Sequence, residues 1–292
     1  MNKLVPHLWY DKEAREAAEF YVSIFGDSAI TGGAILEDTP SGTAETVTVS
    51  LAGQDFMLLS AGPYFKFNPS ISLRVDCSTA EEVESLWKKL SDGGSILMEL
   101  DSYPFSPRYG WCQDRYGLSW QIMQVEGKIS QKITPTLMFV GEQYGRAEEA
   151  IKLYCEVFRE SKAGDISRYG EGQEFDTPGT VMYASFTLEG MKFAAMDSGY
   201  AHEFQFNEAI SFIVNCDTQE EIDYYWDRLS FVPESEQCGW LKDKFGVSWQ
   251  IVPASMDEMM KTGDREKIRR VTEAFLKMKK FDIALLEKAY EG

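Results

Sequence analysis

Two copies of one peptide decide how this chain is organised. GWCQDRYGLSWQIM occupies residues 110–123, and GWLKDKFGVSWQIV occupies residues 239–252. Eight of the fourteen positions are identical. In each copy an Asp stands first and a Gly fourth in a four-residue turn, where the Asp side chain can bond the turn backbone and Gly tolerates a positive φ. Each copy therefore predicts a hairpin turn followed by a closing strand.

The repeat extends well beyond this peptide. Residues 67–90 match residues 206–229 with eleven identities in twenty-four positions, and shorter matches carry the repeat back to the N-terminus. Twenty residues, 91–110, are replaced in the second copy by ten, 230–239. The sequence thus predicts one domain over residues 1–127 and a second over residues 131–253, the second having lost the length of one hairpin.

Within each repeat the pattern is strand, helix and several strands, and then the same order again. The second helix of each repeat begins with a capping box, Thr79 with Glu82 in the first and Thr218 with Glu221 in the second. Apolar residues follow at helical spacing, and β-branched segments broken by glycine predict the strands. After residue 253 the repeat stops. Residues 254–292 show amphipathic helical periodicity, which we interpret as a tail packing on the sheets or on a partner chain.

Composition excludes several classes of protein. With 292 residues, of which 44% are hydrophobic, the chain can fill two cores, and its net charge of -18 disfavours nucleic acid and anionic membranes as partners. The charged first twenty residues do not fit a secretory signal, and the five cysteines form no C-x-x-C pair. We therefore expect a cytoplasmic protein with reduced thiols, acting as a monomer with an internal pseudo-dimer or as a homodimer.

Several segments of the chain carry a family resemblance. EFYVSIFG and DRYGLSWQI resemble the vicinal oxygen chelate superfamily. FNPSISLRVDC, GWCQDRYGLSWQIM and MKKFDIALLEKAY resemble its PhnB-like branch, whose members often carry the name 3-demethylubiquinone-9 3-methyltransferase domain. The resemblance implies an α+β fold of two tandem glyoxalase-like domains, built from paired βαβββ modules that curl around a cavity, with a C-terminal helical tail. It also implies that the tandem chain builds internally the pairing that single-domain relatives achieve by dimerising.

Metal-dependent members of the superfamily hold a divalent ion with side chains from three strands. The resemblance places those positions on Pro6 and Pro135, Ser70 and Ala209, and Gln121 and Gln250. Proline offers no side-chain ligand, and hydroxyls and neutral amides alone bind a divalent ion weakly. We therefore expect neither a metal nor another cofactor. His7 neighbours the first of these positions and should point away from the cavity.

The methyltransferase name finds no support in the glycine pattern. Gly170 and Gly172 cluster, but Phe175 stands where the third glycine of a nucleotide-cradling loop would fall, so we do not expect nucleoside-dependent methyl transfer. One further feature could carry chemistry. His202 lies near Asp197 in sequence, which allows either a general-base pair or a solvated loop histidine.

A cavity that binds a small organic molecule without metal is the hypothesis that remains. We expect a polar floor and an aromatic wall in the first repeat, with Gln250 as the floor's counterpart in the second; the floor comprises Gln121, Ser119 and Ser70, and the wall comprises Tyr103, Phe105, Arg108 and Trp111. Arg108 would suit an anionic or aromatic guest, although an aromatic hairpin packed for stability explains the wall equally well. Two alternatives stay open. One is an enzyme with a displaced metal on His7, Gln121 or Glu45, and the other is a scaffold whose pockets are filled by side chains.

Overall fold

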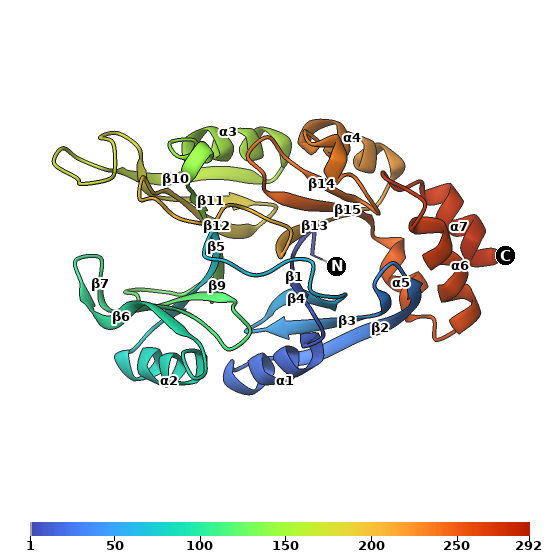
Figure 1. Cartoon of the computed structure of the whole chain (residues 1–292), viewed down its shortest axis with the longest axis horizontal. Helices are drawn as coiled ribbons and strands as arrows, with labels where there is room; N and C mark the ends of the chain where they lie inside the picture. Colours follow the sequence, from blue (N-terminus) through green and yellow to red (C-terminus); the bar gives the residue numbers. More distant parts are fainter. Residues whose placement is uncertain (1) are drawn as a thin grey trace. The chain divides into compact units, whose positions relative to one another are not determined.

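A computed structural model describes residues 2–292 (Figure 1). The first repeat forms two βαβββ modules: β1 (Leu4–Tyr10), α1 (Ala14–Ile24), β2 (Ala29–Thr39), β3 (Gly42–Leu51) and β4 (Gln54–Ser60), and then β5 (Ile71–Cys77), α2 (Ala80–Leu90), β6 (Ser95–Tyr103), β7 (Ser106–Gln113) and β8 (Ser119–Gln124). The predicted α+β fold of paired modules is confirmed.

In the second repeat the last module is shorter. Its elements are β9 (Ile133–Phe139), α3 (Ala147–Val157), β10 (Ser161–Arg168), β11 (Val181–Leu188) and β12 (Met191–Asp197), followed by β13 (Ile210–Cys216), α4 (Gln219–Leu229), β14 (Trp240–Lys242) and β15 (Ser248–Pro253). Short 3-10 turns cover Gly141–Gln143 and Pro233–Ser235. Where the first repeat has the long β6–β7 hairpin, this module has the three-residue β14, as the loss of ten residues predicts.

Modules from different repeats pair to build each sheet. One compact unit, here the first unit, joins Met1–Lys66 with Asn207–Gly292, and the second unit is Phe67–Phe206. The strand order is β14-β15-β13-β1-β4-β3-β2 in the first unit and β10-β11-β12-β9-β5-β8-β7-β6 in the second. The predicted domain boundaries therefore describe sequence repeats. Each compact unit instead combines one module from the first repeat with one module from the second.

An antiparallel strand pair joins the two modules of each unit. β1 pairs with β13 in the first unit, and β5 pairs with β9 in the second. Helices α1 and α4 cover the outer face of the first sheet, and α2 and α3 cover that of the second (Figure 1). The inner faces are left for other contacts.

The repeated peptide forms the same buried turn in both units. The carboxylate of Asp114 accepts hydrogen bonds from the backbone N–H of Tyr116 and Leu118 and from the Trp120 indole, at 2.9, 3.1 and 2.8 Å. Asp243 does the same with Phe245, Val247 and Trp249, at 2.8, 3.0 and 2.9 Å. A buried carboxylate needs such donors because a charge without partners is costly in the interior. This capped turn holds the strand's Trp on the helix-covered side.

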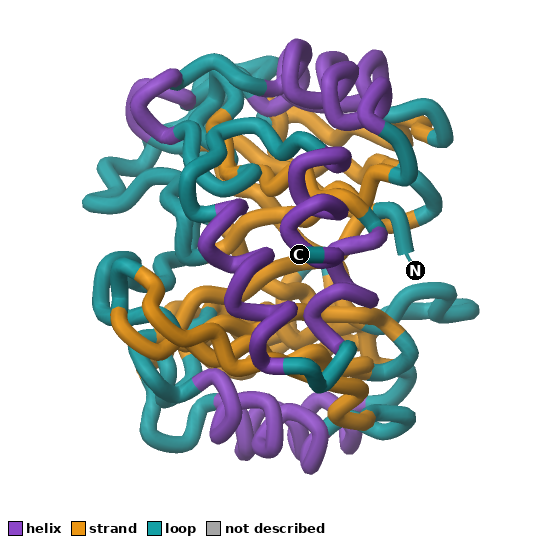
Figure 2. The backbone as a smooth tube through the Cα atoms, turned by 90° about the vertical axis from the view of Figure 1, so that its right-hand side faces the viewer, coloured by secondary structure: helices purple, strands orange, loops and turns teal. Residues whose placement is uncertain are grey.

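Three helices form the C-terminal tail, α5 (Ser255–Lys261), α6 (Arg265–Phe275) and α7 (Ile283–Glu291). Figure 2 shows them as a layer of their own beside the strands, and both α5 and α6 contact β2 of the first unit. The N–H groups of Cys238 and Gly239 donate to the carbonyls of Met278 and Lys279 at 2.8 and 2.7 Å. The predicted packing of the tail on a sheet is confirmed. Within residues 2–292, none of the helices has the length and apolar character needed to cross a bilayer.

We expect Asp243→Ala to lower the free energy of unfolding by about 3 kcal/mol or more, since it orphans three donors in the interior. Urea denaturation followed by tryptophan fluorescence measures the loss. Asp227→Ala on the exposed face of α4 removes the same charge and is the control, with an expected change within about 0.5 kcal/mol. Equal losses in the two variants would mean that the turn carboxylate is not a cap that the fold depends on.

Candidate functional site

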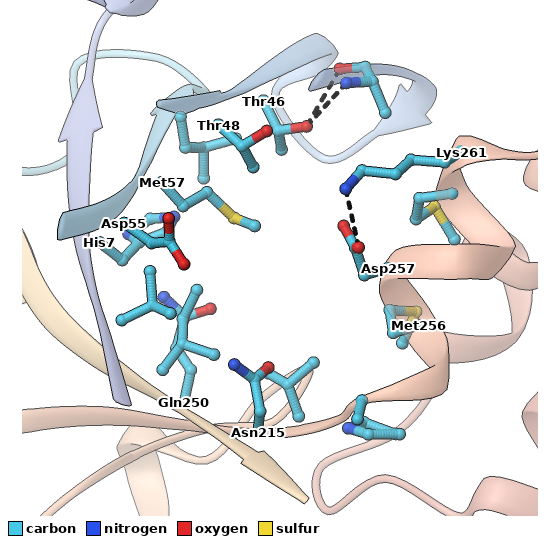
Figure 3. A pocket seen from close by; sticks show the side chains of 18 of the residues that line it. His7, Thr46, Thr48, Asp55, Met57, Asn215, Gln250, Met256, Asp257 and Lys261 are labelled. Carbon is cyan, nitrogen blue, oxygen red and sulfur yellow. Dashed lines mark hydrogen bonds and ion pairs between the residues drawn. The ribbon is translucent and has the colours of Figure 1, made fainter. Parts of the chain in front are cut away.

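The first unit holds a cavity of about 1240 Å³ on the inner face of its sheet (Figure 3). Its walls come from β1, β2, β3 and β4 of the first repeat, from β13, β14 and β15 of the second repeat, and from the tail, chiefly helix α5. Small-molecule sites commonly have volumes of roughly 300–1,000 Å³, so there is room for an organic ligand. No single repeat contains these walls, which means that the pairing of modules creates the cavity.

His7 projects from β1 into this cavity (Figure 3). Its side chain is only 2% exposed, and its Nδ1 has no hydrogen-bond partner among residues 2–292. The ring packs edge-on against Trp240 with centroids 5.3 Å apart. Burial lowers the pKa of His7 to about 3, so the imidazole is neutral at pH 7.

The expected orientation of His7 was wrong. Strand alternation places Val5 and His7 on the inner face, so Pro6 and Leu8 lie on the face covered by helices. The sequence comparison had put the inward position on Pro6, one residue away. An error of one residue in a strand turns every side chain to the opposite face.

Amide side chains from the second repeat line the floor beside His7. Gln250, predicted as a cavity residue, donates from Nε2 to the hydroxyl of Ser211 at 3.0 Å. Asn215 donates from Nδ2 to the carbonyl of Asn2 at 2.7 Å. In the described part of the chain, the amide oxygens of Gln250 and Asn215 accept no hydrogen bond. They are therefore free to accept one from a ligand.

Apolar side chains complete the lining. Three methionines face the cavity, Met57 from β4 and Met256 and Met260 from α5. Ile213, Trp240, Phe275 and Phe281 also line it. Methionine side chains adapt to irregular shapes at low cost, which suits a wall that must close around a guest.

The inner face of the second unit is occupied by its own side chains. The repeat aligns Ile213 with Arg74, and Arg74 forms a two-point ion pair with Asp76 at 2.9 and 3.1 Å. Arg74 also donates to the hydroxyl of Tyr183 and lies 5.5 Å from the centre of its ring. The counterpart of Tyr183 in the first unit is the smaller Thr46. The two units have therefore diverged on the face that forms a cavity in the first.

The predicted floor lies in the second unit and is engaged by neighbouring side chains. The amide oxygen of Gln121 accepts from Tyr109 at 3.2 Å. Ser119 accepts from the Trp111 indole at 2.8 Å and bonds the Ser72 hydroxyl at 3.0 Å. Ser70 precedes β5, and its carbonyl accepts from the N–H of Met138 at 2.7 Å. The structure thus brings Gln121, Ser119 and Trp111 together and places Gln250 in the other unit.

The predicted wall divides between two faces of the β6–β7 hairpin. Tyr103 and Phe105 stack at 5.6 Å and meet Tyr109, with Phe105 59% exposed. Arg108 instead pairs with Glu84 of α2 at 3.0 Å, on the helix-covered side. Ligand binding by these residues stays a prediction. Arg108, the cation of the predicted wall, is paired with a carboxylate of α2.

The remaining candidates have structural partners. Asp197 accepts from the backbone N–H groups of Gly145, Ala147 and Val181 at 2.9, 3.1 and 2.9 Å, which caps the start of α3. His202 bonds the Ser198 hydroxyl through Nε2 at 2.9 Å instead of Asp197, so the general-base pair is not formed. Glu45 pairs with Arg15 at 2.6 Å, outside the cavity.

The residues present do not fit a divalent metal ion. Residues 2–292 contain no group of three or more His, Cys, Asp or Glu side chains placed to hold one. In the cavity wall, His7, Gln250 and Asp55 offer one neutral nitrogen, one amide oxygen and one carboxylate, fewer charged oxygens and imidazoles than divalent ions prefer.

Both repeats of the chain match one protein family. The model of the 3-demethylubiquinone-9 3-methyltransferase family matches residues 2–123 and again residues 131–252. The chain belongs to this family. The predicted PhnB-like identity is confirmed, and both matches cover whole repeats. The family's name describes a reaction that the glycine pattern of this sequence does not support.

Some solved structures are similar to part or most of the chain. The chain is 36% identical to the PhnB protein of Bacillus cereus, with 41% of this chain and 98% of that chain covered and a TM-score of 0.39. It is also similar to a glyoxalase I mutant from Zea mays, with 13% identity, a TM-score of 0.56, and 88% of this chain and 94% of that chain covered. At that identity the likeness shows the fold alone. The chain matches no curated protein.

His7 gives the protein a specific pH dependence. Because its folded pKa is depressed, the unfolded state binds a proton first, and stability is lost as pH falls from about 6.5 towards 3. We expect His7→Leu to remove about 2 kcal/mol of the decline in unfolding free energy between about pH 6.5 and pH 5. Urea titrations of both proteins at the two pH values measure it. Identical declines would show that His7 binds a proton as readily in the folded state as in the unfolded state.

Proposed function

We propose that this family member binds a small organic molecule in the cavity of the first unit, without a resident metal, and acts in the cytoplasm as a monomer or homodimer. The observation that carries the proposal is the buried imidazole of His7, which lines the cavity and whose Nδ1 has no hydrogen-bond partner among residues 2–292. A buried polar group left without a partner costs about 1–3 kcal/mol. A ligand that bonds to His7 removes this cost, which favours a cavity that is filled in use.

The displaced-metal alternative receives less support. His7 lies in the first unit and Gln121 in the second, and Glu45 is paired with Arg15. The three suggested ligands are therefore not gathered in one unit. The scaffold alternative fits the second unit, whose inner face holds Arg74, Asp76 and Tyr183. We therefore propose that the inner face of the first unit binds the ligand and that the inner face of the second unit has a structural role.

Native mass spectrometry of the freshly purified full chain tests the proposal. We expect an organic adduct on the wild type and its loss in Gln250→Leu, which keeps the shape of the side chain and removes its amide. Gln121→Leu is the matched control in the second unit and should keep the adduct. Stoichiometric metal in place of an organic adduct would contradict the metal-free reading.

A transplant of the second unit's inner face gives an independent test. Ile213→Arg with Asn215→Asp introduces the ion pair of Arg74 and Asp76 into the cavity, and we expect ligand retention to fall at least about tenfold because the bulky pair occupies the space. Thermal unfolding checks that the variant is folded. The mirrored change, Arg74→Ile with Asp76→Asn, should leave retention unchanged. Loss of ligand only in the mirrored variant would place the site in the second unit.

A further inference from the structure

The cations of the cavity wall are already paired. Two lysines line the cavity, Lys3 and Lys261. Lys3 forms an ion pair with Glu221 at 2.8 Å, and Lys261 forms one with Asp257 at 2.8 Å (Figure 3). An anionic guest would therefore have to compete with a carboxylate for each lysine. Among residues 2–292, no arginine lines this wall.

Carboxylates, in contrast, remain available. Asp55, Asp217 and Glu258 line the cavity and form no ion pair with any residue from 2 to 292. Asp55 accepts one hydrogen bond, from the side-chain amide of Asn2 at 2.9 Å, through one of its two oxygens. Figure 3 shows its carboxylate beside His7 and pointing into the cavity. The charge that faces a ligand is therefore negative.

The neutral polar groups of the floor also favour a ligand that carries hydrogen-bond donors. One N–H of each amide is engaged, that of Gln250 by Ser211 and that of Asn215 by Asn2, while in residues 2–292 neither amide oxygen accepts a hydrogen bond. His7, 2% exposed, lines the same cavity, and its buried Nδ1 has no hydrogen-bond partner among residues 2–292. A neutral imidazole carries one acceptor nitrogen. The two amide oxygens and the imidazole therefore favour a ligand that donates hydrogen bonds.

The apolar part of the wall favours an apolar ligand surface. Met57 and Met256 face each other across the cavity in Figure 3, and Trp240 packs against His7. A ligand that contacts both sets must combine a donor group with an apolar body. The face of a tryptophan also attracts a cation.

From these observations we infer that the cavity selects an organic cation, an amine carried on an apolar or aromatic body, whose N–H groups donate to Asp55, Gln250 and His7. This inference rests on the proposed function and names the chemical class of its ligand. It reverses the anionic guest that Arg108 suggested, because Arg108 is paired with Glu84 in the other unit.

Three probes with one body and different head groups test the inference: 4-phenylbutylamine, 4-phenylbutyrate and 4-phenylbutanol. Isothermal titration of the full chain with each probe at pH 7 gives their dissociation constants. We expect the amine to bind at least about tenfold more tightly than the carboxylate or the alcohol, the advantage of one charge-assisted hydrogen bond.

A pair of isosteric variants locates the charge that selects the probe. Asp55→Asn should weaken amine binding about tenfold and leave the alcohol unchanged. Asp227→Asn on α4 changes the net charge equally and should have no effect. Equal weakening by both variants would mean that the acidic surface as a whole, and not the cavity, attracts the amine.

The outcomes separate the inference from the proposal beneath it. Binding of the carboxylate or the alcohol as tightly as the amine, abolished by Ile213→Arg with Asn215→Asp, would overturn the cationic class and leave the cavity as a binding site. Absence of binding by all three probes would overturn both.

Discussion

The pairing of β1 with β13 is the interaction on which the cavity depends. This antiparallel pair aligns His7 with Ser211 and joins the strand that starts at Leu4 to the one that starts at Ile210. β4 and β15 then lie parallel to these two strands on either side. The inner residues of all four strands therefore share one face. Since side chains alternate along a strand, a slip of one residue would replace His7 by Pro6 and remove the polar floor.

Duplication has kept the outer face of each unit and altered the inner one. Asp114 and Asp243 cap the same turn, and Trp120 and Trp249 fill the same place beneath the helices. On the inner face, the alignment replaces Arg74 by Ile213. The outer face is fixed by close packing, where changes of volume are felt at once. A wall that faces open space can accept a different side chain at lower cost.

The shortened hairpin explains why the tail belongs to the first unit. A Cβ on Gly110 would lie 2.5 Å from the ring of Trp87 in α2, and one on the equivalent Gly239 would lie 2.6 Å from Phe281 of the tail. The glycine admits an aromatic ring in both cases. In the first unit the strand β14 is only three residues long, and its preceding N–H groups are satisfied by carbonyls of the tail. The same tail supplies α5, the wall that faces His7, so the segment that completes the sheet also completes the cavity.

By itself the sequence determined the local structure and the family. The repeated Asp and Gly specify turns, the capping boxes specify helix starts, and apolar periodicity specifies which faces are buried, because each of these signals acts between residues near one another in the chain. Only the tertiary structure decided which modules pair, that His7 faces inward, and that Gln250 and not Gln121 lines the cavity. Repeats of similar sequence can pair within or across copies with the same local signals. The choice depends on contacts between residues far apart in the chain, such as His7 with Trp240 and Gly239 with Phe281, and no local pattern records them.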